Sequence, residues 1–161
     1  MSATIEIKKD LAARKIMVTS QFHASLENLW DAFTNPETLE KWWAPKPYEA
    51  FTKKIHFADG GQWLYYMLSP EGEKHWCIAE FKNIHPKESY EVFDAFCDEE
   101  GKINTDLPRM NWTNSFREKN GMATVTNVIA FAKEEDMKKI LEMGFEEGYT
   151  TGLNQLQKLL G

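Results

Sequence analysis

Residues 34–45 read TNPETLEKWWAP and indicate a short helix with a large apolar end. Asn35 suits the N-cap, where a side-chain oxygen accepts hydrogen bonds from unpaired backbone amides, and Pro36 suits the first helical position. The proline that closes the segment cannot continue a helix. Trp42 and Trp43 precede it, so we interpret both indoles as packing residues and expect at least one to be buried.

The residues before this helix predict a strand followed by another helix. Residues 15–22 alternate between apolar and polar side chains, which is the period of a strand, and we expect the sheet to begin here. Ser25 has the chemistry of an N-cap. Apolar residues then follow at the spacing of one buried helical face, namely Leu26, Leu29, Trp30 and Phe33.

The residues after the 34–45 segment predict an antiparallel sheet and a final helix. Residues 48–131 keep a period of two and are interrupted by turn sequences, which predicts about six strands joined by hairpins. Residues 98–108 are polar and rich in turn formers, so we expect a long loop there. Residues 134–160 begin with three acidic residues and predict one long amphipathic helix.

Length and charge narrow the class of protein. The chain has 161 residues, which fits one domain; we assign residues 14–161 to it and residues 1–13 to an N-terminal extension. The net charge of −6, without a basic stripe, argues against nucleic acid as a partner. No apolar run approaches the roughly 18 residues of a membrane span. The charged N-terminus does not resemble a signal peptide, so we expect a cytoplasmic protein.

The cysteines and histidines do not predict a metal site. Cys77 and Cys97 lack the CxxC spacing and are interpreted as reduced core thiols. The four histidines are scattered, without metal-ligand spacing. We therefore expect no metal and no cofactor, and we name no catalytic residue.

The 34–45 segment resembles the T-D/N-P-x-x-L-x-x-W-W-x-P signature of SRPBCC proteins, the START/Bet v 1-like superfamily. The likeness is closest to the branch named for the C-terminal domain of the activator of the heat-shock-protein-90 ATPase. Further matches follow in the expected order at Gly60-Gly61-x-Trp63 with Met67, Pro70-Glu71-Gly72, Pro86, and Gly148-Tyr149-x-x-x-Leu153-x-x-Leu156-x-x-x-Leu160.

The resemblance implies an α+β helix-grip (Bet v 1-like) fold. In this fold a curved antiparallel sheet of about seven strands wraps around a long C-terminal helix, with two short helices after the first strand. The superfamily uses the cavity between sheet and helix for lipids, sterols, polyketides and other apolar molecules. The sequence pattern agrees with this architecture, because a sheet with one apolar face needs a cover and only the last predicted helix is long enough.

Three glycines lie four residues apart on one stripe of the predicted last helix: Gly144, Gly148 and Gly152. Each costs about 1 kcal/mol relative to alanine in a helix interior, so the stripe needs an explanation. The absent side chains either leave space for a pocket over the aromatic sheet or allow close backbone packing or a bend. The family resemblance favours the pocket.

Two polar residues stand out among the candidates for lining this pocket. Asp94 and Asn127 each interrupt an apolar strand face, and either could orient a ligand. We favour the interpretation that Asn127 bonds a neighbouring side chain or water and that Asp94 faces solvent. The full set of cavity candidates is Trp63, Tyr65, Met67, Phe81, Asp94, Phe96, Trp112, Asn127, Ile129, Phe131, Gly144, Gly148 and Gly152.

Three classes of function stay open. The first is non-catalytic binding of a small, largely apolar molecule by a monomer or homodimer. The second is a co-chaperone-like interaction protein of the stress response, with a chaperone as partner, which the branch name implies. The third is a cavity-based cyclase or hydrolase, for which the acid–base candidates are Tyr65, Asp94, Asn127 and His56.

Overall fold

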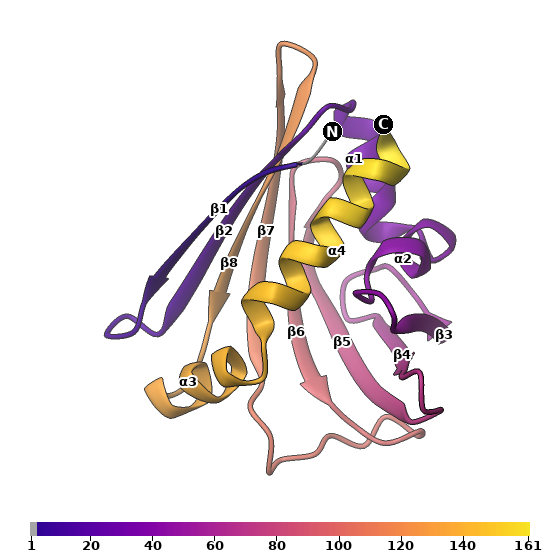
Figure 1. Cartoon of the computed structure of the whole chain (residues 1–161), viewed down its shortest axis with the longest axis vertical. Coiled ribbons are helices and arrows are strands. Elements are labelled where there is room, and N and C mark those ends of the chain that lie inside the picture. The colour runs from indigo at the N-terminus through magenta and orange to yellow at the C-terminus, as the bar shows by residue number, and fades with distance from the viewer. Residues whose placement is uncertain (1–2) are drawn as a thin grey trace.

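The fold is built on one curved antiparallel sheet of eight strands (Figure 1). The computed structural model describes residues 3–161. The strands are β1 Thr4–Asp10, β2 Lys15–Phe22, β3 Glu49–Ile55, β4 Gln62–Leu68, β5 Lys74–His85, β6 Ser89–Phe96, β7 Met110–Lys119 and β8 Met122–Ala130. Their order across the sheet is β1-β2-β8-β7-β6-β5-β4-β3.

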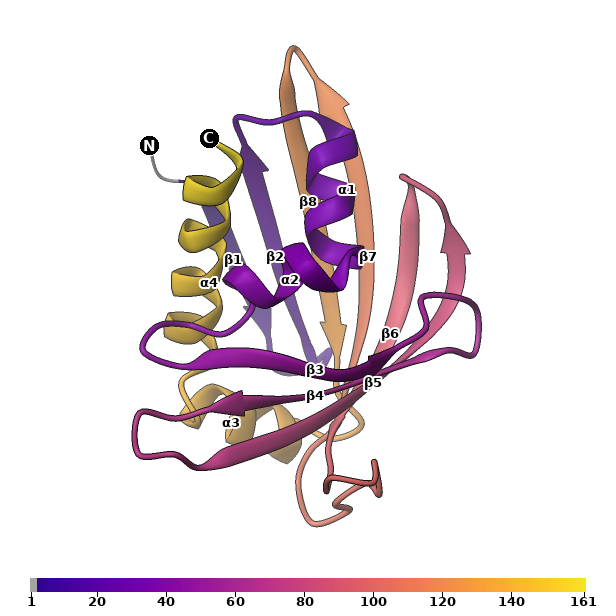
Figure 2. The same cartoon turned by 90° about the vertical axis from the view of Figure 1, so that its right-hand side faces the viewer.

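Four helices cover one face of this sheet. They are α1 Leu26–Thr34, α2 Pro36–Trp42, α3 Glu134–Glu142 and α4 Phe145–Leu160. Figure 1 shows α4 running across the strands, and Figure 2 shows α1 and α2 over the same face beside it. The predicted α+β helix-grip fold is thus confirmed. Among residues 3–161, no helix has both the length and the apolar composition needed to cross a bilayer.

The two short helices begin where the sequence predicts. The Ser25 side chain accepts a hydrogen bond from the backbone N–H of Asn28 at the start of α1. The Asn35 side chain accepts one from the backbone N–H of Glu37, and Pro36 occupies the first turn of α2. Side-chain capping therefore supplies partners for backbone amides that neither helix can satisfy internally.

The C-terminal half of α4 is anchored on the end of α2. A Cβ atom at Gly152 would lie 3.3 Å from the carbonyl oxygen of Trp42, so the two backbones approach closely because residue 152 has no side chain. The Gln155 side-chain amide donates to the carbonyls of Trp42 at 3.0 Å and of Ala44 at 2.9 Å. Trp42 is fully buried, and its indole N–H donates to the carbonyl of Ala32 at 2.8 Å.

The sheet begins earlier than the sequence indicates, and it has eight strands where about seven are expected. Residues 4–10, within the predicted extension, form the edge strand β1 and pair with β2; residues 1–2 lie outside the described residues. Only Ile5 and Ile7 carry the apolar alternation in this strand. Its other positions are mostly charged, as is common for an edge strand, and the sequence signal is correspondingly weak.

The predicted helix over 134–160 is two helices, α3 and α4, that meet at Gly144. Gly144 has φ of +89°, in the left-handed region, and its N–H donates to the carbonyl of Leu141 at 3.1 Å. A left-handed residue of this kind ends a helix, and glycine adopts it without steric cost. The apolar spacing continues across the break, so periodicity alone does not reveal it.

Replacing Trp42 with alanine should lower the free energy of unfolding by about 3–5 kcal/mol, because a fully buried indole is lost and a cavity is left. Urea unfolding measures this loss. Trp76→Ala is the control, because Trp76 is only partly buried and contacts the Tyr66 ring at a centroid distance of 4.8 Å. Equal losses in the two variants would contradict the assigned role of Trp42.

Candidate binding cavity

A cavity of about 240 Å³ lies between the sheet and the first half of α4. Its wall is built from the segment after α2, from the strands β4 to β7, and from the junction of α3 with α4. Most of the side chains are aromatic or aliphatic. The wall consists of Trp43, Pro45, Tyr65, Met67, His75, Cys77, Asp94, Phe96, Met110, Trp112, Ile140, Met143, Gly144, Phe145, Gly148 and Tyr149.

A smaller cavity of about 30 Å³ adjoins the first. Its volume is close to the roughly 30 Å³ that one water molecule occupies in liquid water. Trp43, Tyr65, Asp94 and Trp112 line both spaces, so these residues form the wall between them. Of these four residues, Tyr65, Asp94 and Trp112 are buried.

The three glycines of the stripe have different roles. Gly144 and Gly148 line the cavity, and a Cβ atom at Gly148 would have only the Pro45 ring near it, at 3.8 Å. Gly152 instead permits the close approach of α4 to Trp42 and lies outside the cavity. The pocket explanation therefore fits Gly148, whereas close packing explains Gly152 and a chain bend explains Gly144.

Asp94 is the carboxyl group of the cavity wall, and it is only 9% exposed. Burial raises the pKa of this carboxyl from 3.8 to about 7, while the Trp112 indole, the Arg109 guanidinium and the backbone N–H of Ala95 lower it. The Trp112 indole N–H lies near the carboxyl but outside hydrogen-bond geometry. The interpretation that Asp94 faces solvent is wrong, because the strand turns this side chain towards the cavity.

Tyr65 and Cys77 are paired across β4 and β5, and both line the cavity. The Trp43 indole N–H donates to the Tyr65 hydroxyl at 3.0 Å. Burial raises the pKa of the Tyr65 hydroxyl and of the Cys77 thiol well above their usual values, and the neighbouring Asp94 charge raises both further. Both groups are therefore protonated at neutral pH.

Asn127 belongs to a buried hydrogen-bond chain that joins α4 to the sheet. The Tyr149 hydroxyl donates to Asn127 Oδ1 at 2.7 Å, and Asn127 Nδ2 donates to Asn114 Oδ1 at 2.7 Å. Asn127 is fully buried, so this chain satisfies polar atoms that would otherwise be costly. The interpretation that Asn127 bonds neighbouring side chains is confirmed.

The cavity candidates from the sequence separate into three groups. Tyr65, Met67, Asp94, Phe96, Trp112, Gly144 and Gly148 line the main cavity, and Trp63 and Phe81 line the small one. The others lie outside both. Asn127 and Ile129 are buried in the core, Phe131 borders a separate groove beside α3, and Gly152 packs against α2. The period of a strand predicts which face a residue occupies, but not whether a gap lies above it.

Several wall residues escaped the sequence reasoning. Trp43 and Tyr149 stand in the quoted family motifs, which are a usable signal, but the sequence pattern favours a packing role for Trp43. Ile140, Met143 and Phe145 come from the junction at Gly144, which periodicity does not reveal. Cys77 and Met110 carry no distinctive sequence signal.

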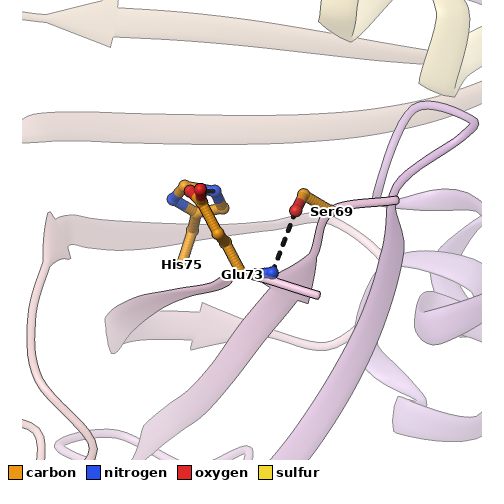
Figure 3. Close-up of polar contacts among 3 residues, drawn as sticks. All are labelled: Ser69, Glu73 and His75. Atoms are coloured by element: carbon orange, nitrogen blue, oxygen red, sulfur yellow. Dashed lines mark hydrogen bonds and ion pairs between the residues drawn. The ribbon is translucent and has the colours of Figure 1, made fainter. Parts of the chain in front are cut away.

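His75 lines the cavity and lies next to Glu73 and Ser69 of the turn between β4 and β5 (Figure 3). His75 lies on β5, with its Nε2 3.8 Å from a carboxyl oxygen of Glu73, and both side chains are largely exposed. The Ser69 hydroxyl oxygen accepts a hydrogen bond from the backbone N–H of Glu73 at 3.0 Å, which holds the turn between β4 and β5. His75 is thus a partly exposed polar residue of the cavity wall.

His56 is exposed in the turn after β3 and does not line either cavity, so it is not an acid–base group of this site. Cys77 and Cys97 are both free thiols. In residues 3–161, no three histidine, cysteine or acidic side chains are grouped closely enough to hold a metal ion.

Comparisons with known proteins place the chain among structural relatives. Residues 23–161 match the family described as Activator of Hsp90 ATPase homolog 1-like protein. The chain is similar to protein Ms6760 from Mycobacterium smegmatis, with 31% identity, TM-score 0.90, and coverage of 99% of this chain and 97% of that one. A protein from Arthrobacter aurescens is 30% identical, with TM-score 0.91 and coverage of 96% and 90%. No curated protein matches the chain.

The Asp94 carboxyl should make stability depend on pH. Because burial raises its pKa in the folded state, the folded protein binds more protons than the unfolded one between about pH 4 and pH 7. The free energy of unfolding should fall as pH rises through this window, by up to about 1.4 kcal/mol per pH unit. Asp94→Asn should remove this contribution.

Urea unfolding at pH 5 and pH 8 measures the effect. Glu99→Gln, which removes one negative charge at an exposed position, should keep the pH dependence of the unchanged protein. If Asp94→Asn loses as much stability between the two pH values as the unchanged protein does, Asp94 does not titrate in this window.

Proposed function

The chain belongs to the family of Activator of Hsp90 ATPase homolog 1-like proteins, and from this membership we propose that it binds a small, largely apolar molecule without converting it. The observation that carries the proposal is the cavity of about 240 Å³ under α4, with its mainly aromatic and aliphatic wall. Ligand sites are typically concave and apolar, with a few polar groups that fix orientation.

The size of the cavity limits the ligand. A buried apolar cavity of about 150 Å³ takes up a benzene molecule, whereas drug-sized ligands occupy roughly 300–1,000 Å³. A space of about 240 Å³ lies between these values and suits a compound of one or two fused rings. The aromatic side chains Trp43, Trp112 and Phe145 would contact the flat faces of such a ring system.

The protonation of the wall supports binding over catalysis. A cysteine reacts as the thiolate, and burial keeps Cys77 as the thiol at neutral pH. Asn127 is engaged in hydrogen bonds, and His56 lies elsewhere. A cyclase or hydrolase would have to rely on Asp94 and Tyr65 or on His75, whose side chain is about half exposed, so we rank this function third.

The second function is a co-chaperone-like interaction, which the family description supports. A pull-down with Hsp90 separates it from the first, because a ligand-binding protein should leave the chaperone behind. We further propose a cytoplasmic location, because the free thiols of Cys77 and Cys97 suit a reducing compartment, and a monomer or homodimer.

Gly148→Leu tests the proposed binding. The new side chain would pass the Pro45 ring and fill the cavity, so binding of the apolar fluorescent probe 2-methylnaphthalene should weaken at least tenfold. The free energy of unfolding should stay the same or rise by less than about 1 kcal/mol, because leucine favours a helix more than glycine does. Probe titration and thermal melting measure the two effects.

Thr151→Leu provides the control, because residue 151 is exposed on the same helix and should leave probe binding unchanged. A strongly destabilised Gly148→Leu that binds the probe as well as the unchanged protein would show that the space is not the binding site.

A further inference from the structure

Asp94 is a buried carboxyl group without a cationic partner. None of the ion pairs among residues 3–161 includes it. The positive charge of Arg109 lowers the pKa of Asp94, but its guanidinium carbon stacks over the Phe93 ring, 3.8 Å from the ring centroid. A buried carboxyl normally has a counter-ion or several hydrogen bonds, because losing hydration is costly.

The polar groups around Asp94 meet this need only in part. The backbone N–H of Ala95 lies beside the carboxyl, and the buried Trp112 indole N–H makes no hydrogen bond. The Tyr65 hydroxyl accepts the hydrogen bond of the Trp43 indole and keeps one O–H of its own to donate. A carboxyl group offers about four acceptor sites on its two oxygens. Asp94 therefore keeps acceptor capacity at the wall that the two cavities share.

We infer that the ligand carries a hydrogen-bond donor, a hydroxyl or an ammonium group on its ring system, and that this donor binds the Asp94 carboxyl. This inference rests on the proposed function, since it assumes that the cavity is occupied by a small ring compound. Asp94 then sets specificity, because a compound without a donor leaves the buried carboxyl unpaired. The surrounding indole and phenol rings suit either donor, and they attract a cation in particular.

Three probes with the same naphthalene ring test the inference. 2-Methylnaphthalene has no donor, 2-naphthol has a neutral donor, and 2-(aminomethyl)naphthalene has a cationic one. At least one donor probe should bind the unchanged protein about tenfold more tightly than 2-methylnaphthalene at pH 7.5, as expected for a hydrogen bond to a charged group. Without a partner at Asp94, a donor probe should bind less tightly than 2-methylnaphthalene, because its polar group would lose hydration.

Variants at Asp94 assign the preference to its carboxyl group. Asp94→Leu keeps the branched shape but cannot accept, so the preference for any donor probe should disappear. Asp94→Asn keeps one acceptor oxygen and similar size, so it should keep a preference for 2-naphthol and lose one for the amine. Glu99→Gln removes the same charge outside the cavity and should change neither ratio.

The outcomes separate the two proposals. If all three probes bind the unchanged protein equally, or if Asp94→Asn and Asp94→Leu both keep the full preference, the inference about Asp94 is wrong while apolar binding stands. If no probe binds, the proposed function fails and the inference fails with it. Each ratio is measured within one folded protein, so a general loss of stability in a variant does not imitate the expected change.

Discussion

The close contact between α4 and the end of α2 determines where the rest of the molecule leaves space. At Gly152 the helix backbone approaches the Trp42 carbonyl, and Gln155 adds two hydrogen bonds to the same segment. One turn earlier, a Cβ atom at Gly148 would have only the Pro45 ring near it. The helix therefore packs closely on α2 at Gly152 and borders the cavity at Gly148. A side chain at residue 152 would move the helix that roofs this cavity.

Some buried polar groups stabilise the fold, whereas Asp94 is a candidate for ligand binding. The chain from Tyr149 through Asn127 to Asn114 links α4 to the sheet, so it stabilises the attachment of this helix. Asp94 has the opposite character, because it is buried at the cavity wall and lacks a counter-ion. A buried carboxyl group without a counter-ion is costly to folding, and a ligand that bound it would offset part of that cost.

The sequence predicted the architecture better than the site, for physical reasons. Strand period and capping residues are local signals, and Ser25 and Asn35 act as local chemistry requires. The cavity depends on the path of one helix over the sheet, which no local pattern encodes. Gly148 and Gly152 belong to the same sequence pattern. Gly148 nevertheless borders the cavity, whereas Gly152 lies against the carbonyl oxygen of Trp42. The role of Asp94 depends on the same helix path. A residue on a strand face lines a cavity only where the covering helix does not pack directly against that face.

An NMR titration of the ¹⁵N-labelled protein with 2-naphthol tests the location of binding most directly. The account predicts that the largest shift changes occur at the backbone amides of Tyr65, Asp94 and Gly148 and at the indole N–H of Trp112, which surround the cavity. Saturating changes confined to residues outside its wall, such as the partly exposed Trp76, with these four signals unmoved, would contradict it.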